Sequence, residues 1–199
     1  MSSSWPEVYH RMLLHPDVLP DDVLLAMVEC MGKHAAYLDA FPTGGNWLCM
    51  EANGLFHVGV LFPEFRDAAK WRTDALTRLR RELDVQVYPD GVQYELTPGY
   101  HNVALRNFVQ TLRLAGLNAM PMPDGYKERL EGMYEMNMRA MSPDRDVPPF
   151  NDSWSVSVRS ILAEGLGFFP KRRDWEWIVT DGKSGRKPAE TSLLFPYAG

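Results

Sequence analysis

The sequence has very little cysteine and no long apolar run, and both absences narrow the class of protein. Cys30 and Cys49 are the only cysteines among 199 residues. Each lies in an apolar stretch with helical spacing, so we expect two buried free thiols rather than a disulfide framework or a multi-cysteine zinc site. No apolar stretch approaches the roughly 20 residues that a membrane-spanning helix needs. A membrane span is therefore not expected.

A strong net charge is also missing. The chain has 21 basic and 26 acidic residues, a net charge of -5, with the two signs interspersed. Without a basic stripe, a nucleic-acid partner is not expected. An acidic polymer remains a possible ligand, because the local cations of a cleft decide its binding. No metal or cofactor is expected, because no metal-ligand spacing such as His-Glu-x-x-His connects His10, His15, His34 and His57.

The two ends of the chain lead to expectations about a parent protein. The start, Met1-Ser-Ser-Ser-Trp-Pro, lacks the basic patch and apolar run of a signal peptide. The last thirty residues are mixed and charged, and they stop abruptly at Leu193-Leu-Phe-Pro-Tyr-Ala-Gly. We expect the chain to be a fragment of a longer protein, whose targeting signal would lie elsewhere.

Helical periodicity dominates the first 165 residues. Apolar residues recur every three or four positions from Asp22 to Leu38, which predicts a helix with one core-facing side. Between Trp47 and Phe62 they occupy several sides, which predicts an inner helix buried all round. The segment from Pro63 to Val87 has proline in its first turn and one apolar stripe, which predicts an outer amphipathic helix.

The later segments continue this alternation. A short extended piece at Val92–Leu96 should precede a helix that ends near Gly116. Further helices are expected from an N-cap at Asp124 and from Trp154, with a proline-rich loop of functional character between them. Buried and amphipathic helices in antiparallel pairs predict an all-α fold, an incomplete (α/α) toroid of stacked helix hairpins.

The most informative motifs lie between Gly44 and Ser153. In chain order they are Gly-Gly-Asn before a helix, Phe-Pro-Glu-Phe followed by a tryptophan, Asp-Gly-Val-Gln-Tyr-Glu leading to Tyr-His, and Pro-Phe-Asn-Asp-Ser. Their order and spacing resemble the helical domain of the heparinase II/III family of polysaccharide lyases. The related alginate and oligo-alginate lyases share the pattern.

This resemblance implies a lyase that cleaves a uronate-containing glycan, such as heparin, heparan sulfate or alginate, by β-elimination without a cofactor. It implies that residues 1–169 belong to the toroid. Residues 170–199 would then form a linker and the start of a β-sandwich domain, with Phe195-Pro-Tyr-Ala-Gly at its entry. The parent would be periplasmic or secreted. We expect the isolated chain to be inactive, because a further tyrosine and histidine of the family lie near its end or beyond it.

Elimination from a uronic acid requires particular side chains. The C5 proton is weakly acidic, so an amide or a protonated carboxyl must neutralise the C6 carboxylate. One tyrosine can act both as base and as acid in a syn elimination. The resemblance places Asn46 as the neutralising amide and Tyr100 as the catalytic tyrosine. Alternatively, Asn46 is a plain helix N-cap, and the Tyr100 hydroxyl is tied to the main chain.

Five other residues are predicted substrate contacts: Trp47, Glu51, Glu95, His101 and Trp154. On a regular helix, His101 would point away from Tyr100, which favours a supporting or substrate-contact role. Trp47 stands where many relatives have a histidine, so a histidine base is missing there. The indole is expected to stack on a sugar ring or to lie in the core.

Two other functions remain open. A non-catalytic glycan-binding toroid would explain the replacement of histidine by Trp47. An (α/α)-barrel glycoside hydrolase would use Asp90 and Glu95 as its acid and base. Against the hydrolase, Asp90-Gly91 is typical of a turn, and Glu95 is expected to anchor the loop that carries Tyr100. Four arginines are candidate cations for an acidic polymer, with none singled out: Arg106, Arg139, Arg145 and Arg159.

Overall fold

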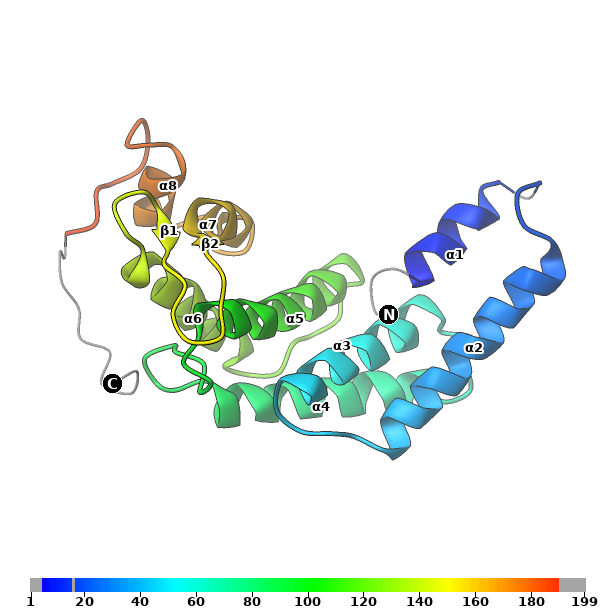
Figure 1. Ribbon diagram of the computed structural model, residues 1–199. Coiled ribbons are helices and arrows are strands. Elements are labelled where there is room, and N and C mark those ends of the chain that lie inside the picture. Colours follow the sequence, from blue (N-terminus) through cyan, green and yellow to red (C-terminus); the bar gives the residue numbers. More distant parts are fainter. Residues whose placement is uncertain (1–4, 16, 190–199) are drawn as a thin grey trace. The chain divides into compact units, whose positions relative to one another are not determined.

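The computed structural model describes residues 5–15 and 17–189 (Figure 1). This part of the chain contains eight helices and one two-stranded sheet, so the predicted mainly helical fold class is confirmed. Within the described ranges, no helix is both long and apolar enough to span a membrane. The helices are α1 (Trp5–Leu13), α2 (Asp21–Ala40), α3 (Gly45–Leu61), α4 (Ala68–Gln86), α5 (Pro98–Leu117), α6 (Tyr126–Ala140), α7 (Val158–Leu166) and α8 (Arg173–Val179).

The chain forms two compact units. Unit 1 comprises the described residues up to Glu82 together with Asn107–Pro123. Unit 2 comprises Leu83–Arg106 and the described residues from Asp124 onward. Helices α4 and α5 contribute residues to both units, and each unit buries its own set of apolar side chains.

Helices α2 and α3 form a hairpin in unit 1, as the sequence predicted. Their connection, Phe41–Gly44, is short, which makes the two helices antiparallel neighbours. Every residue from Ala52 to Val60 is buried, so α3 is the inner helix that its all-round apolar pattern indicated. Arg78 of α4 donates to the carbonyl oxygens of Leu38 and Asp39 and so satisfies the C-terminal end of α2.

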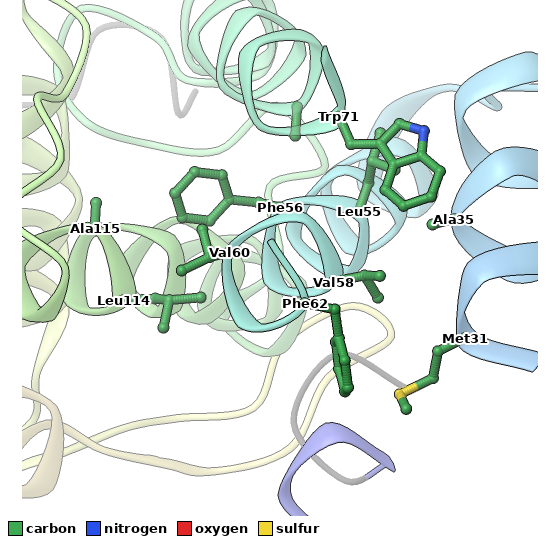
Figure 2. Close-up of a cluster of buried hydrophobic side chains, with 11 residues drawn as sticks. Met31, Ala35, Leu55, Phe56, Val58, Val60, Phe62, Trp71, Leu114 and Ala115 are labelled. Carbon is green, nitrogen blue, oxygen red and sulfur yellow. The ribbon is translucent and has the colours of Figure 1, made fainter. Parts of the chain in front are cut away.

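The core of unit 1 surrounds α3, where apolar side chains of α2, α4 and α5 meet it (Figure 2). Burying a large apolar side chain stabilises the fold by about 1.5–3 kcal/mol, so this cluster is the main support of the unit. Its members are Met31, Ala35, Leu55, Phe56, Val58, Val60, Phe62, Trp71, Ala75, Leu114 and Ala115.

A buried polar cluster joins α3 to the part of α5 that belongs to unit 1. The Asn53 amide group donates to Asn107 Oδ1 at 3.1 Å and to Gln110 Oε1 at 2.8 Å. The Thr111 hydroxyl donates to Asn53 Oδ1 at 3.0 Å. Because a buried amide must find partners for both its ends, these bonds fix one register of the two helices.

Three predicted helix starts are wrong. Pro63–Asp67 form turns rather than the first turn of α4, and they place the Phe65 ring 5.6 Å from the ring of Trp71. The N-cap of α6 is Gly125 rather than Asp124, because the backbone there has a φ of 71°, which favours glycine. The third wrong start is at Trp154, because the next residues pair as a strand.

The sheet of unit 2 consists of β1 (Asp146–Val147) and β2 (Val156–Ser157), which are antiparallel. Val147 pairs with Val156, and α7 starts directly after β2. The predicted proline-rich loop is therefore the loop of a hairpin.

Helices α6, α7 and α8 pack together in unit 2. The rings of Tyr134, Phe169 and Trp175 contact one another, with centroids 5.4–6.0 Å apart. A Cβ atom at Gly165 would lie 2.9 Å from the Tyr134 ring, so glycine allows α7 to approach closely. Helix α8 packs on α7 within the segment that was expected to be a linker. Residues 190–199, with Phe195-Pro-Tyr-Ala-Gly, lie outside the described residues, so the domain boundary after residue 169 stays a prediction.

Candidate functional site

Asn46 lies in the first turn of α3 in unit 1. The extended residue before this helix is Gly44, and Gly45 has a φ of 61°, a value that favours glycine. The N-cap position is thus occupied by Gly44, and the alternative role of Asn46 as the N-cap is wrong. Its side chain is nearly buried, with 8% of the residue exposed. The amide lies at the N-terminal end of α3, where the helix dipole is positive, and this position suits a group that binds a carboxylate.

The two other candidates on α3 differ in exposure. Trp47 is 71% exposed, so it is not the core tryptophan that the sequence allowed. Glu51 is partly exposed and accepts the backbone N–H of Thr43 at 3.0 Å. This bond ties the α2–α3 connection to α3, which gives Glu51 a structural function.

Tyr100 lies in the first turn of α5 in unit 2. The hydroxyl oxygen of Thr97 accepts the Tyr100 N–H at 3.2 Å, and its carbonyl accepts the His101 N–H at 3.0 Å. Thr97 therefore caps the helix, and Pro98 occupies the first helical position, where its missing N–H costs nothing.

The loop between β1 and β2 packs against this helix start. The Asn151 amide group donates to the carbonyl of Leu96 at 3.1 Å. Ser153 Oγ accepts the N–H of Gly99 at 2.7 Å, one of the donors that a helix start leaves without an intrahelical acceptor. The loop therefore completes the cap of α5 from a distant part of the sequence.

The same loop surrounds the Tyr100 side chain. The Tyr100 hydroxyl donates to Asp152 Oδ2 at 3.4 Å, a loose hydrogen bond. The Trp154 ring lies 6.2 Å from the Tyr100 ring at an angle of 63°. The Tyr100 hydroxyl thus bonds a carboxylate rather than the main chain, so the alternative of a hydroxyl tied to the backbone is wrong. Of the predicted site residues, Tyr100 and Trp154 are brought into contact.

His101 points away from Tyr100, as predicted for neighbours on a helix. It is 1% exposed, its Nε2 donates to the carbonyl of Met133 at 3.0 Å, and its Nδ1 accepts the N–H of Gln93. Burial lowers the pKa of His101 to about 4, so the imidazole is neutral at neutral pH. With both nitrogens bonded to the main chain, His101 positions the segment before α5 and has no atom left for a substrate.

The carboxylates proposed for a hydrolase lie in a turn. Asp90 Oδ1 accepts the N–H of Val92 at 3.2 Å, and Gly91 has a φ of 87°. Glu95 is exposed, and its N–H donates to Gln93 Oε1 at 3.0 Å. These bonds give Asp90 the turn role that the sequence predicted.

Three residues next to Tyr100 had not been singled out from the sequence: Gly99, Asp152 and Ser153. The motif Pro-Phe-Asn-Asp-Ser was a signal for the last two, because such residues cap helices and turns. Their partner lies more than fifty residues earlier in the chain, and no spacing rule connects the two segments. Among the residues that the structure describes, no cluster of three His, Cys, Asp or Glu side chains could hold a metal ion.

Known proteins resemble this chain in sequence. The profile of the heparinase II/III N-terminus family matches residues 1–177. A heparin-sulfate lyase of Bacteroides stercoris is 34% identical over 173 residues, which cover 84% of this chain and 26% of the relative. A heparin-sulfate lyase of Pedobacter heparinus is 31% identical over 98% of this chain and 30% of its own length. The chain thus spans less than a third of these relatives.

Solved structures of known proteins resemble the fold of this chain. A heparinase III structure has a TM-score of 0.75 at 32% identity, over 87% of this chain and 28% of that chain. A heparan sulfate lyase of Pedobacter heparinus has a TM-score of 0.67 at 33% identity, over 78% of this chain and 25% of its own. By a sequence match over most of its length, supported by these structures, the chain belongs to the heparinase II/III N-terminus family.

Proposed function

We propose that this chain is part of a polysaccharide lyase that cleaves a uronate-containing glycan of the heparan sulfate type by β-elimination. The names of the relatives support the reaction and the substrate class. The observation that carries the proposal within this chain is the setting of Tyr100. Its partly exposed phenol stands at the start of a helix, between the carboxylate of Asp152 and the ring of Trp154.

In the proposed mechanism, the amide of Asn46 donates a hydrogen bond to the C6 carboxylate of the substrate and stabilises the charge that develops on it. The phenolate of Tyr100 removes the C5 proton. The electrons of the C5–H bond form the C4–C5 double bond, and the C4–O4 bond breaks. The Tyr100 hydroxyl then returns the proton to O4 of the leaving sugar.

The exposed aromatic residues fit a carbohydrate ligand. Trp47 and Trp154 are 71% and 53% exposed, and indole faces pack well on the C–H surfaces of sugar rings. We propose that both contact the substrate. From the family resemblance we also propose that the parent protein is periplasmic or secreted.

Kinetics of the full-length protein on heparan sulfate test the proposal, with the absorbance of the unsaturated product as the signal. Tyr100→Phe should lower kcat by about 10²–10⁴, the usual contribution of a general acid or base. Asn46→Ala should lower kcat by about 10²–10³, as expected for the loss of one donor to a developing charge.

Tyr37→Phe is the matched control, because it removes a hydroxyl from a tyrosine of α2 that is 62% exposed. It should leave kcat unchanged. The proposal fails if the wild-type protein forms no unsaturated product, or if Tyr100→Phe keeps the wild-type rate.

A further inference from the structure

Unit 2 has a pocket of about 300 Å³ next to the loop between β1 and β2, the loop that packs against Tyr100. This volume lies at the lower end of the range for small-molecule sites. The walls come from α5, from the segment around β2 and from α7. Its lining residues include Gly99, Asn102, Arg106, Trp154, Ser157 and Ser160.

The polar groups of this pocket include the carboxylate of Glu164 and the hydroxyl of Ser155, which donates to Asp146 Oδ2 at 3.1 Å. Its other polar side chains are of two kinds. The Asn102 amide group donates to the carbonyl of Pro98 and exchanges two hydrogen bonds with Asn137. These bonds hold Asn102 in place as part of the pocket wall. In contrast, Arg106, Ser157 and Ser160 make no side-chain hydrogen bond or ion pair with the residues that the structure describes. One guanidinium and two hydroxyl groups therefore remain available to a ligand.

The pocket adjoins Tyr100 through Trp154. The indole lines the pocket and also contacts the Tyr100 ring. A Cβ atom at Gly99 would lie 2.9 Å from Trp154 Cζ3 and from Ser153 Oγ, so the glycine lets the indole pack directly on the start of α5. A ligand in the pocket would touch the same indole that flanks the proposed catalytic phenol.

The chemistry of these groups selects a class of ligand. An indole face packs on a sugar ring, serine hydroxyls bond sugar hydroxyls, and a guanidinium binds a carboxylate or a sulfate in a bidentate manner. Building on the proposed lyase function, we infer that this pocket is a subsite for a sugar near the cleaved bond. Arg106 binds the anionic group of that sugar, a carboxylate or a sulfate.

The test compares Arg106→Gln, Arg106→Lys and wild type in the full-length protein. The substrates are heparan sulfate and an N-acetylated, unsulfated polymer of the same backbone. Arg106→Gln should raise KM by about tenfold or more, because a hydrogen bond to a charged group is lost, and should leave kcat within about twofold. Arg106→Lys should restore part of the loss, since it keeps the charge and loses the bidentate geometry. A loss on both polymers identifies a carboxylate, and a loss on heparan sulfate alone identifies a sulfate.

Two further variants separate binding from misfolding. Ser160→Leu should also raise KM, because it fills the pocket from an exposed position of α7. Arg81→Gln changes an exposed arginine of α4 outside the pocket and should have no effect. Wild-type KM for Arg106→Gln on both polymers, with Tyr100→Phe inactive, would overturn the subsite while the proposed function stands.

Calorimetry covers the case in which the wild-type protein forms no unsaturated product. A heparan sulfate tetrasaccharide is titrated into Tyr100→Phe and into Tyr100→Phe combined with Arg106→Gln. The subsite predicts that Kd is at least about tenfold higher for the double variant. Equal Kd values would refute it.

Discussion

Tyr100 and His101 are adjacent in the sequence, yet α5 sends their side chains into opposite environments. The phenol is partly exposed beside Asp152, whereas the imidazole is buried against the main chain of Gln93 and Met133. The helix geometry therefore places the proposed catalytic phenol of Tyr100 near the surface and gives the neighbouring imidazole of His101 a buried structural role. The contribution of His101 to the stability of the folded chain should depend on pH.

The pKa of His101 is lowered by burial from its ordinary value of 6.5 to about 4. Between these two values the unfolded chain binds a proton that the folded chain does not, so stability should fall as pH falls from 6.5 to 4. The loss attributable to His101 is about 3 kcal/mol over this range. The pKa of His57 is also lowered by burial, so it adds a loss of the same sign.

Urea unfolding of the chain at several pH values between 4 and 6.5 measures this dependence. His101→Gln should reduce the slope of the unfolding free energy against pH by up to about 1.4 kcal/mol per pH unit, the effect of one proton. His15→Gln, at an exposed position, should leave the slope unchanged. An unchanged slope in His101→Gln would show that the imidazole is not held neutral.

At the scale of helices and strands, close contacts decide which glycines can be replaced. Gly165 of α7 faces the buried rings of Tyr134 and Trp175, and a Cβ atom would lie 2.9 and 3.0 Å from them. A Cβ atom at Gly116 of α5 would have no neighbouring atom within 4 Å, and the φ of this residue lies outside the left-handed region. The same substitution should therefore have opposite effects at the two positions.

Gly165→Ala should lower the free energy of unfolding by about 1–3 kcal/mol, because buried rings cannot yield without strain. Gly116→Ala should raise it by up to about 1 kcal/mol, because alanine favours the helix and restricts the unfolded chain. Thermal unfolding of both variants checks this. Equal shifts of Tm in one direction would contradict the packing described for α7.

The sequence predicted the helices far better than their ends. Periodicity identified α2 and α3, because their apolar stripes depend only on the spacing of residues along one helix. It misplaced the starts of α4, α6 and α7, where turns or a strand precede the helix. It also missed α8 and the β1–β2 pair, which are short and depend on distant contacts.

The candidate site was predicted in the same uneven way. Asn46 and Tyr100 came from motif order, and the divergence of His101 came from helix geometry. The proximity of Asp152 and Ser153 to Tyr100 depends on a loop that returns from far along the chain, so no local pattern could indicate it. The sequence did not distinguish Arg106 from the three other candidate arginines, and its position in the wall of the pocket does.

At the scale of the whole molecule, the chain spans 26% of the Bacteroides stercoris lyase and 30% of the Pedobacter heparinus lyase. Two features of this chain bear on the proposed activity. They are the Asn46 amide at the start of α3 and the Tyr100 phenol at the start of α5. The inactivity of the isolated chain and the β-sandwich after residue 170 stay predictions.

Cleavage of heparan sulfate by the full-length protein in water enriched in heavy oxygen tests the central claim most directly. Elimination breaks the C4–O4 bond without adding water, so the products should contain an unsaturated uronate and no heavy oxygen. Hydrolysis would add one labelled oxygen to each new reducing end. Mass spectra of the products that show unsaturated, unlabelled ends would agree with a lyase, and saturated, labelled ends would contradict it.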